Sequence, residues 1–371
     1  KISGSDEVAK ARSLENYLKL KFEIKTDASD EYENIEKMVA SKFTNSTGIT
    51  RLYLSCLQQM NIKTEIVITC DKTTAKFDPD FDTWSYLDEF LIYLPTSNTY
   101  LAPNDILSRV GFVTPNYTGQ KGLFIKEVDL GGETKAGIGK VKTIGYADYT
   151  ASLSTIDADV TFPSNFSETN IKLKQTYTGY AAYYSQPLIG FLNDVQKKEY
   201  EEKTLKITGE DATMSNVSMS GIAENDILSK PFVMECVLKS PSLLETAGNK
   251  YLLKIGLLIG PQAEMYQDGK RTLQPQIVHT HMYNRKITVT IPDGYKLSNV
   301  EALNMQQKFM QDDKVLGEFI STYTLSANKL EVTVVEDYRV LDFPLDKFED
   351  YRKVINAAAD FNKIQIILEK K

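Results

Sequence analysis

Apolar residues change their spacing along this chain. Up to Met60 they recur every three or four positions, as in Val8, Ala11, Leu14 and Leu18, which is the period of an amphipathic helix. The pattern predicts three helices: residues 5–24, a segment that begins at Ser29, and Thr47–Met60, with Asn61 as a left-handed cap.

From about residue 140 onward, apolar and polar residues alternate instead, as in ITVTIP (residues 287–292) and LEVTVV (330–335). Alternation is typical of strands with one buried face, and about ten such segments predict a β-sandwich. KYLLKIGLLIG (250–260) and PQIVHTHM (275–282) belong to this set, and SANK (326–329) predicts a hairpin turn. Two helices interrupt the strands, one after Tyr184 and one after Pro344.

Short apolar runs separate these two regions: TEIVITC (64–70), DEFLIYLP (88–95), TYLAPND (99–105) and GLFIKEV (122–128). GGETKAG (131–137) is rich in small residues and predicts a linker. The sequence therefore predicts an α+β protein with two domains. Residues 1–128 form a small α+β domain, and residues 129–371 form a mostly antiparallel β-sandwich with two short helices.

Composition argues against several classes of protein. The formal net charge is −7 and there is no long basic run, which argues against nucleic-acid binding. No apolar run approaches the roughly 20 residues that cross a bilayer. The three cysteines form neither a disulfide framework nor a Cys-x-x-Cys pair. We expect no cofactor, because the glycines of GIGKVK (137–142) lack the rest of a nucleotide-binding motif.

The order of the first segments resembles the core of bacterial transglutaminase-like proteins, which are relatives of the papain-type cysteine peptidases. The helix after Asn45 is followed by the strands of residues 64–70, 88–95 and 99–105. In that family the helix begins with a nucleophilic Cys, the next strand carries a His, and the third carries an Asp just before a Pro. The resemblance places Ser46, Glu89 and Ala102 at these three positions.

These residues differ from the family triad in a way that matters chemically. A Cys at a helix N-terminus beside an imidazole forms the thiolate readily, whereas a Ser hydroxyl is a far weaker acid. Glu89 is a poor general base for a hydroxyl at its ordinary pKa of about 4.3, and Ala102 can orient nothing. We interpret Ser46 as the N-cap of its helix, a role that Thr47 could also take.

Other residues do not supply the missing groups. Cys56 lies on the apolar face of its helix, and Cys70 and Cys236 lie in strands. His279 and His281 share one face of a strand and could pair on a metal, but no third ligand accompanies them, so we expect a solvated strand face and no metal site.

Residues 78–89 partly match a calcium-binding loop. The acidic residues fall at suitable positions, but Thr83 stands where that loop requires Gly. We interpret the segment as a solvated loop before the strand that contains Glu89.

The second half resembles the C-terminal β-region that follows the transglutaminase-like domain in certain bacterial envelope proteins. ITVTIPDGYKL (287–297) and FEDYRKVINAAADF (348–361) carry this likeness. It implies a periplasmic or cell-surface protein. The chain opens with KISGSDEV, so we expect that a leader or an upstream domain has been removed.

The favoured hypothesis is a non-catalytic binding or scaffold module for a peptide, a glycan or an envelope protein. Its groove would be lined by Asn45, Ser46, Trp84, Glu89 and Phe90. One alternative is an enzyme of the transglutaminase or amidase type with an unusual nucleophile. Another is that the β-region alone docks a partner, with the N-terminal domain as a spacer.

Overall fold

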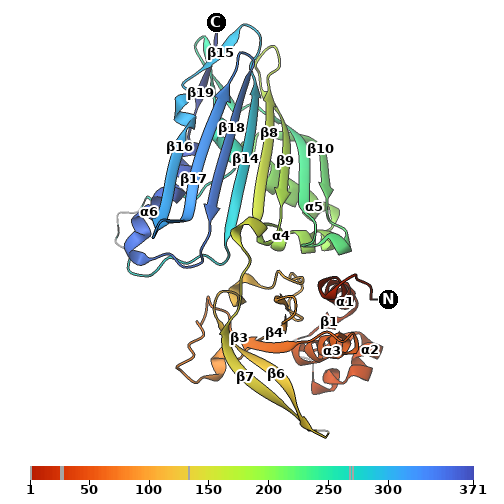
Figure 1. Cartoon of the computed structure of the whole chain (residues 1–371). Helices are drawn as coiled ribbons and strands as arrows, with labels where there is room; N and C mark the ends of the chain where they lie inside the picture. Colours follow the sequence, from red (N-terminus) through yellow and green to blue (C-terminus); the bar gives the residue numbers. More distant parts are fainter. Residues whose placement is uncertain (1, 26–28, 133, 267–268, 270) are drawn as a thin grey trace. The chain divides into compact units, whose positions relative to one another are not determined.

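The computed structural model describes residues 2–25, 29–132, 134–266, 269 and 271–371 (Figure 1). Helices make up 28% and strands 37%, and most strand pairs are antiparallel, so the predicted α+β class is confirmed. The chain divides into two compact units. The first contains Lys1–Ala147 and Glu224–Ser229, and the second contains Asp148–Ala223 and Lys230–Lys371.

The first unit begins with helices that pack on a sheet. They are α1 (Glu7–Lys21), the 3-10 turn η1 (Asp30–Glu33), α2 (Ile35–Ser41) and α3 (Ser46–Gln59). The second predicted helix is broken, because the side chain of Asn34 accepts a hydrogen bond from the Lys37 N–H and starts a new helix there. Asn61 has a φ of 56° after α3, which confirms the predicted left-handed cap.

The sheet of the first unit has five antiparallel strands in the order β5-β4-β3-β6-β7. Their bounds are β3 (Glu65–Thr69), β4 (Glu89–Leu94), β5 (Thr99–Leu101), β6 (Lys121–Gly131) and β7 (Thr134–Thr143); a two-residue parallel pair joins β1 (Glu23–Ile24) to β2 (Phe43–Thr44). Alternate residues of β4 serve two cores: Ile92 and Leu94 pack with the helices, whereas Leu91 packs with Val67 and Phe124.

The expected linker at residues 131–137 is part of the hairpin formed by β6 and β7, in which Lys121 pairs with Thr143. Glu133 itself lies outside the described residues. The prediction of a linker was therefore wrong, because these small residues form the end of one strand and the start of the next. The chain first passes from one compact unit to the other between Ala147 and Asp148.

A buried ion pair ties α1 to the segment that follows β5. The Lys19 ammonium lies 2.9 Å from the Glu15 carboxylate and also donates to the carbonyl and hydroxyl oxygens of Ser108, at 2.6 and 2.7 Å. The other oxygen of Glu15 accepts the Val110 N–H at 2.6 Å. Burial lowers the pKa of Lys19, and the negative charge of Glu15 partly offsets this lowering. This network fixes the loop just beyond Ala102.

The second unit is built on an eight-stranded sheet in the order β10-β11-β9-β8-β14-β18-β17-β16. Only β14 and β8 pair in parallel. The bounds are β8 (Leu153–Thr161), β9 (Thr169–Tyr177), β10 (Thr213–Ser220), β11 (Phe232–Ser240), β14 (His281–Thr290), β16 (Met305–Gln311), β17 (Lys314–Leu325) and β18 (Lys329–Tyr338). Ser326 and Lys329 close the turn between β17 and β18, as predicted.

One face of this sheet is covered by α6 (Phe348–Asn362), which lies over β16 and β17 (Figure 1). A four-stranded sheet has the order β12-β13-β19-β15, with β12 (Leu244–Ala247), β13 (Lys250–Leu253), β15 (Tyr295–Ser298) and β19 (Ile366–Lys370). Between Tyr177 and β10 the chain forms α4 (Tyr180–Tyr183), the 3-10 segment η5 (Gln186–Phe191) and α5 (Asp194–Leu205).

Two predicted strands of this unit are shorter than expected. Residues 250–260 form β13 and then a 3-10 segment, η7 (Ile255–Ile259). Gly256 allows this turn to lie against α6, because a Cβ there would be 2.2 Å from the Phe361 carbonyl oxygen. Within residues 275–282, Gln276 forms only an isolated bridge with Asp342, and β14 begins at His281.

We predict that Lys19→Met lowers the free energy of unfolding by about 3–5 kcal/mol, because it leaves the Glu15 carboxylate buried without its cation. Urea unfolding followed by circular dichroism measures the change. Lys21→Met is the matched control, since Lys21 is exposed on the same helix, and it should stay within about 0.5 kcal/mol of the wild type. Equal effects of the two substitutions would contradict the assigned role.

Candidate functional site

The start of α3 carries the first of the positions singled out in the sequence. Asn45, not Ser46, is the N-cap: its side chain accepts the Gly48 N–H at 2.8 Å from an extended backbone (φ −102°, ψ 179°). Asn is as good a cap as Ser, so the interpretation of Ser46 as the cap was wrong. Ser46 is the first residue of α3 and is partly exposed.

Glu89 begins β4, where it pairs with Thr69. Its side chain is half-buried and accepts a hydrogen bond from the Tyr117 hydroxyl. Burial raises the pKa of Glu89, and the bond from Tyr117 partly opposes this; the charges of Asp88 and Asp71 raise it further. The neighbours of Glu89 are thus a phenol and other carboxylates, not an imidazole.

Ala102 follows β5 and is buried with Val113 and Phe124 in the second core of the first unit. Its carbonyl oxygen accepts the Ser108 hydroxyl at 3.1 Å, and Ser108 also binds the buried Lys19. The position is therefore held firmly, but it presents only a methyl group.

The proposed groove residues lie on several segments. Trp84 stands in a short 3-10 turn before β4 and is 85% exposed, and Phe90 follows Glu89 on β4. Asn45 stands at the start of α3, where its side chain donates a hydrogen bond to Glu33 and accepts one from the Gly48 N–H. Both histidines lie in the second unit.

The side chains that most often bind metal ions are spread over both units. Among the residues that the structure describes, no three His, Cys, Asp or Glu side chains lie close enough together to hold a metal ion. The three cysteines are free thiols, and Cys70 and Cys236 are buried. Within the same described segments, no helix has the length and apolar character to span a membrane.

The inner face of β14 and β18 holds a cluster that the sequence reading did not anticipate. Because side chains alternate across a strand, Ile287 and Val289 share this face with Arg285, Tyr283 and His281. Across the ladder, His281 pairs with Tyr338 and Tyr283 with Glu336. The face is thus apolar at one end and polar at the other.

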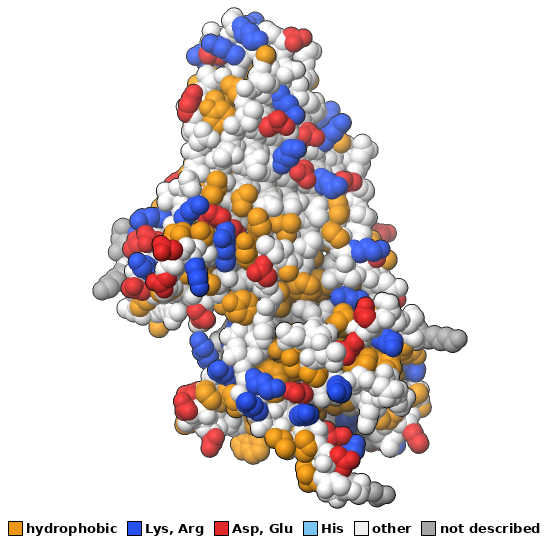
Figure 2. Space-filling model, viewed as in Figure 1, with side chains coloured by type: hydrophobic (Ala, Val, Ile, Leu, Met, Phe, Trp, Pro, Cys, Tyr) orange, Lys and Arg blue, Asp and Glu red, His pale blue; other side chains and the backbone are white. Residues whose placement is uncertain are grey.

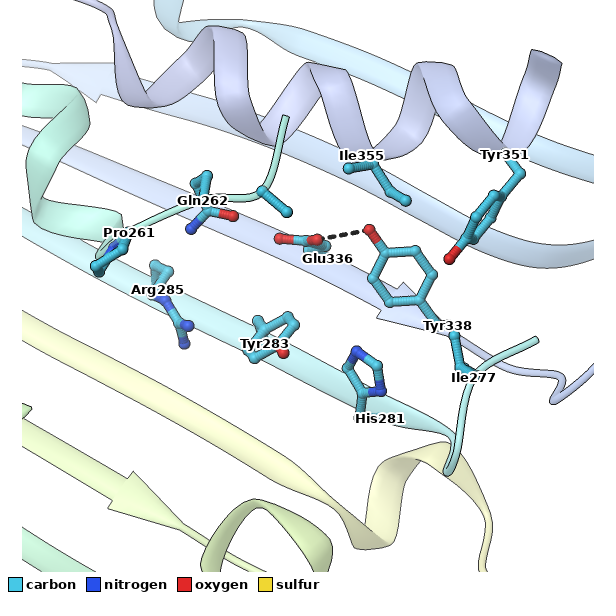
Figure 3. A pocket seen from close by; sticks show the side chains of 11 residues that line it. Pro261, Gln262, Ile277, His281, Tyr283, Arg285, Glu336, Tyr338, Tyr351 and Ile355 are labelled. Carbon is cyan, nitrogen blue, oxygen red and sulfur yellow. Dashed lines mark hydrogen bonds between the residues drawn. The ribbon is translucent and has the colours of Figure 1, made fainter. Parts of the chain in front are cut away.

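These polar residues line a cavity of about 380 Å³ beneath α6. Figure 3 shows His281, Tyr283 and Arg285 along β14, Glu336 and Tyr338 on β18, and Tyr351 and Ile355 reaching down from α6. Pro261, Gln262, Ala263 and Ile277 complete the lining. Pro261 and Ala263 are exposed, so the cavity meets the surface beside them.

Glu336 is the acidic group of the cavity and is only 7% exposed. Its carboxylate accepts the Tyr338 hydroxyl at 2.7 Å. Burial raises the pKa of Glu336 to about 6, against the lowering effects of Tyr338 and of the Arg285 charge. The carboxyl therefore titrates near neutral pH.

Arg285 is 8% exposed and places most of its N–H groups on backbone carbonyl oxygens. It donates to Ile259 at 3.0 Å, to Ser154 at 2.6 Å and to Asn284 at 3.1 Å, and its guanidinium lies 5.0 Å from the centre of the Tyr283 ring. The cation is thus held in place and supplies a fixed positive field behind Glu336.

His281 does not lie on a solvated strand face, so that expectation was wrong. Burial lowers the pKa of His281 to about 4, so the ring is neutral at pH 7. Its Nδ1 lies 3.1 Å from the His279 carbonyl oxygen, which places the proton on Nδ1 and leaves Nε2 as an acceptor. The ring packs 5.0 Å from that of Tyr338 and 5.1 Å from that of Tyr283.

A larger hollow of about 900 Å³ lies in the first unit, between the end of α3, the start of β3 and the hairpin of β6 and β7. The hollow is lined in part by Leu54, Ile62, Ile66 and Ile125, and by none of the predicted groove residues.

On the face of the molecule in Figure 2, acidic and basic side chains are interspersed among apolar patches.

No family model matches the chain, and none of the curated proteins does. It is similar to a solved structure from Parabacteroides distasonis ATCC 8503 described as a "putative protease", with 11% identity and a TM-score of 0.48. The match covers 99% of this chain and 53% of that one, so the chain spans about half the length of that protein. A likeness this distant carries no argument about activity.

We predict that His281 makes the fold sensitive to acid. Its folded pKa of about 4 lies below the unfolded value of 6.5, so as pH falls from 7 to 5 the unfolded chain gains a proton that the folded chain does not. This lowers the free energy of unfolding by about 2 kcal/mol at pH 5. Glu336 acts in the opposite direction, because its folded pKa is raised.

The comparison of wild type with His281→Gln separates the two effects. Urea unfolding of both proteins at pH 7 and pH 5, followed by circular dichroism, should show the larger loss in the wild type. Equal losses in the two proteins would mean that His281 is not buried as described.

Proposed function

We propose that this chain is a non-catalytic binding protein whose first unit has a transglutaminase-like fold with a degenerate triad. Asn45, Ser46, Trp84, Glu89 and Phe90 would form its groove for a peptide, a glycan or another protein. We further propose that it acts in the periplasm or at the cell surface of a bacterium, on the basis of the sequence resemblance.

The main support is the environment of Glu89. At the position that the resemblance assigns to the family's general base, the Glu89 carboxyl is bonded to Tyr117 and lies near Asp71 and Asp88. A base for catalysis needs a nearby nucleophile that it can deprotonate. The bonded neighbour here is a phenol whose own pKa is raised by burial and by the Glu89 charge. The third position, Ala102, offers no polar atom on its side chain.

Trp84 supports a binding role. An indole ring that is 85% exposed is unusual for a large aromatic side chain, and exposed Trp residues are frequent anchors of interfaces. It lies five residues before Glu89 on the segment that leads into β4. An aromatic face close in sequence to a carboxylate suits ligands with both apolar and hydrogen-bonding parts.

A second candidate is an enzyme in which Ser46 is the nucleophile. The raised pKa of Glu89 favours it, because a carboxyl with a higher pKa is a better general base near neutral pH. Ser46 also stands at the positive end of the α3 dipole.

We predict that a ligand identified on peptide or glycan arrays shifts the fluorescence of Trp84. Trp84 is the single tryptophan of the chain, so the emission reports on this segment alone and should move to shorter wavelength as the indole leaves water. Calorimetry should show at least tenfold weaker binding for Trp84→Ala. Phe81→Ala is the matched control, because Phe81 is 62% exposed on the same loop, and it should bind nearly as the wild type does.

An array with no ligand, or a ligand that Trp84→Ala binds as well as the wild type does, would overturn the proposed groove. Labelling by a serine-directed probe that is lost in Ser46→Ala would instead establish the enzyme.

A further inference from the structure

We propose that the cavity between β14, β18 and α6 binds a single sugar ring, stacked on tyrosine rings and held through its hydroxyls by Glu336, His281 and the tyrosine hydroxyls. This site belongs to the second unit, shares no residue with the proposed groove, and does not depend on the first unit being a binding module.

The first argument is the aromatic wall. The rings of Tyr338 and Tyr351 meet edge to face at 5.9 Å, and His281 packs against Tyr338 and Tyr283. These rings come from two strands and a helix and surround one space (Figure 3). The C–H face of a pyranose is apolar, and tyrosine rings offer a matching flat surface with a polar tip.

The second argument is the supply of hydrogen-bonding groups. The hydroxyls of Tyr283 and Tyr351 have no hydrogen-bond partner among the residues that the structure describes. One oxygen of Glu336 is bonded to Tyr338, which leaves the other as an acceptor. Nε2 of His281 is a further acceptor, because Nδ1 carries the proton. A ligand with several hydroxyls can both donate to and accept from this set.

Charge distinguishes a sugar from an ionic ligand. Arg285 and Glu336 line the same cavity, where the positive charge of Arg285 and the negative charge of Glu336 offset each other. An added anion or cation would leave one buried charge without compensation, which is costly. A neutral polyhydroxyl ligand avoids that cost.

The size of the cavity limits the ligand. Its 380 Å³ lies near the lower end of the range for small-molecule sites, about 300–1,000 Å³. This volume suits one ring, with any further residue of a longer glycan leaving past the exposed Pro261 and Ala263.

The test is saturation-transfer NMR on the full chain at pH 7.5 with glucose, galactose, mannose and N-acetylglucosamine, and with choline and acetate as charged probes. We expect transfer to the ring protons of at least one sugar and none to choline or acetate. Glu336→Gln should weaken the binding at least tenfold, because the amide is uncharged and has one acceptor oxygen where the carboxylate has two, one of which already accepts the Tyr338 hydroxyl.

Glu331→Gln is the matched control. Glu331 lies on the same strand, β18, but on its opposite face, where it pairs with Lys329, so sugar binding should be unchanged. If Glu336→Gln does not fold, Tyr283→Phe removes a single unpartnered hydroxyl and should also weaken the binding severalfold.

Three results would overturn the proposal: no transfer to any of the four sugars, sugar binding that Glu336→Gln and Tyr283→Phe leave intact, or binding of choline or acetate alone. The emission of Trp84 should not respond to a sugar in this cavity. Failure here is therefore distinguishable from failure of the groove in the first unit.

Discussion

The pairing register of β14 with β18 is the constraint on which the second unit depends. His281 stands opposite Tyr338, and Tyr283 opposite Glu336. Since a shift by one residue would turn every side chain to the other face, this register places Ile287 and Val289 in the core and collects the polar residues at one end. The helix α6, which lies over β16 and β17, reaches the polar end with Ile355 and Tyr351, which face the cavity.

The first unit depends on a different buried interaction. Lys19 and Glu15 on α1 are both buried and are joined to Ser108 and Val110. An ion pair of this kind adds little net stability, but breaking it leaves a buried charge, so it specifies how the helix and the loop after β5 fit together. That loop holds Ala102, which keeps the frame of the candidate site in place without supplying a reactive group.

Local sequence signals predicted much of the secondary structure. Periodicity identified α1 and α3, the alternating strands of the second half, and the hairpin at Ser326. The misreadings arose where two local signals competed. Asn45 and Ser46 are both good capping residues, and the structure shows that Asn45 is the cap. The small residues at 131–137 fit a linker and a hairpin equally well, and they lie in a hairpin. Neither choice can be made without knowing what packs around the segment.

The sequence by itself determined the α+β class, because helical and strand periods depend only on the order of apolar residues along the chain. It also placed Ser46 at the start of a helix, Glu89 on a strand, and Ala102 at the end of a strand segment, where the structure ends β5 one residue earlier. The tertiary structure alone decided that His281 and Glu336 share one cavity. They are far apart in the chain, and a strand pattern shows which residues point inward but not which strand lies beside it.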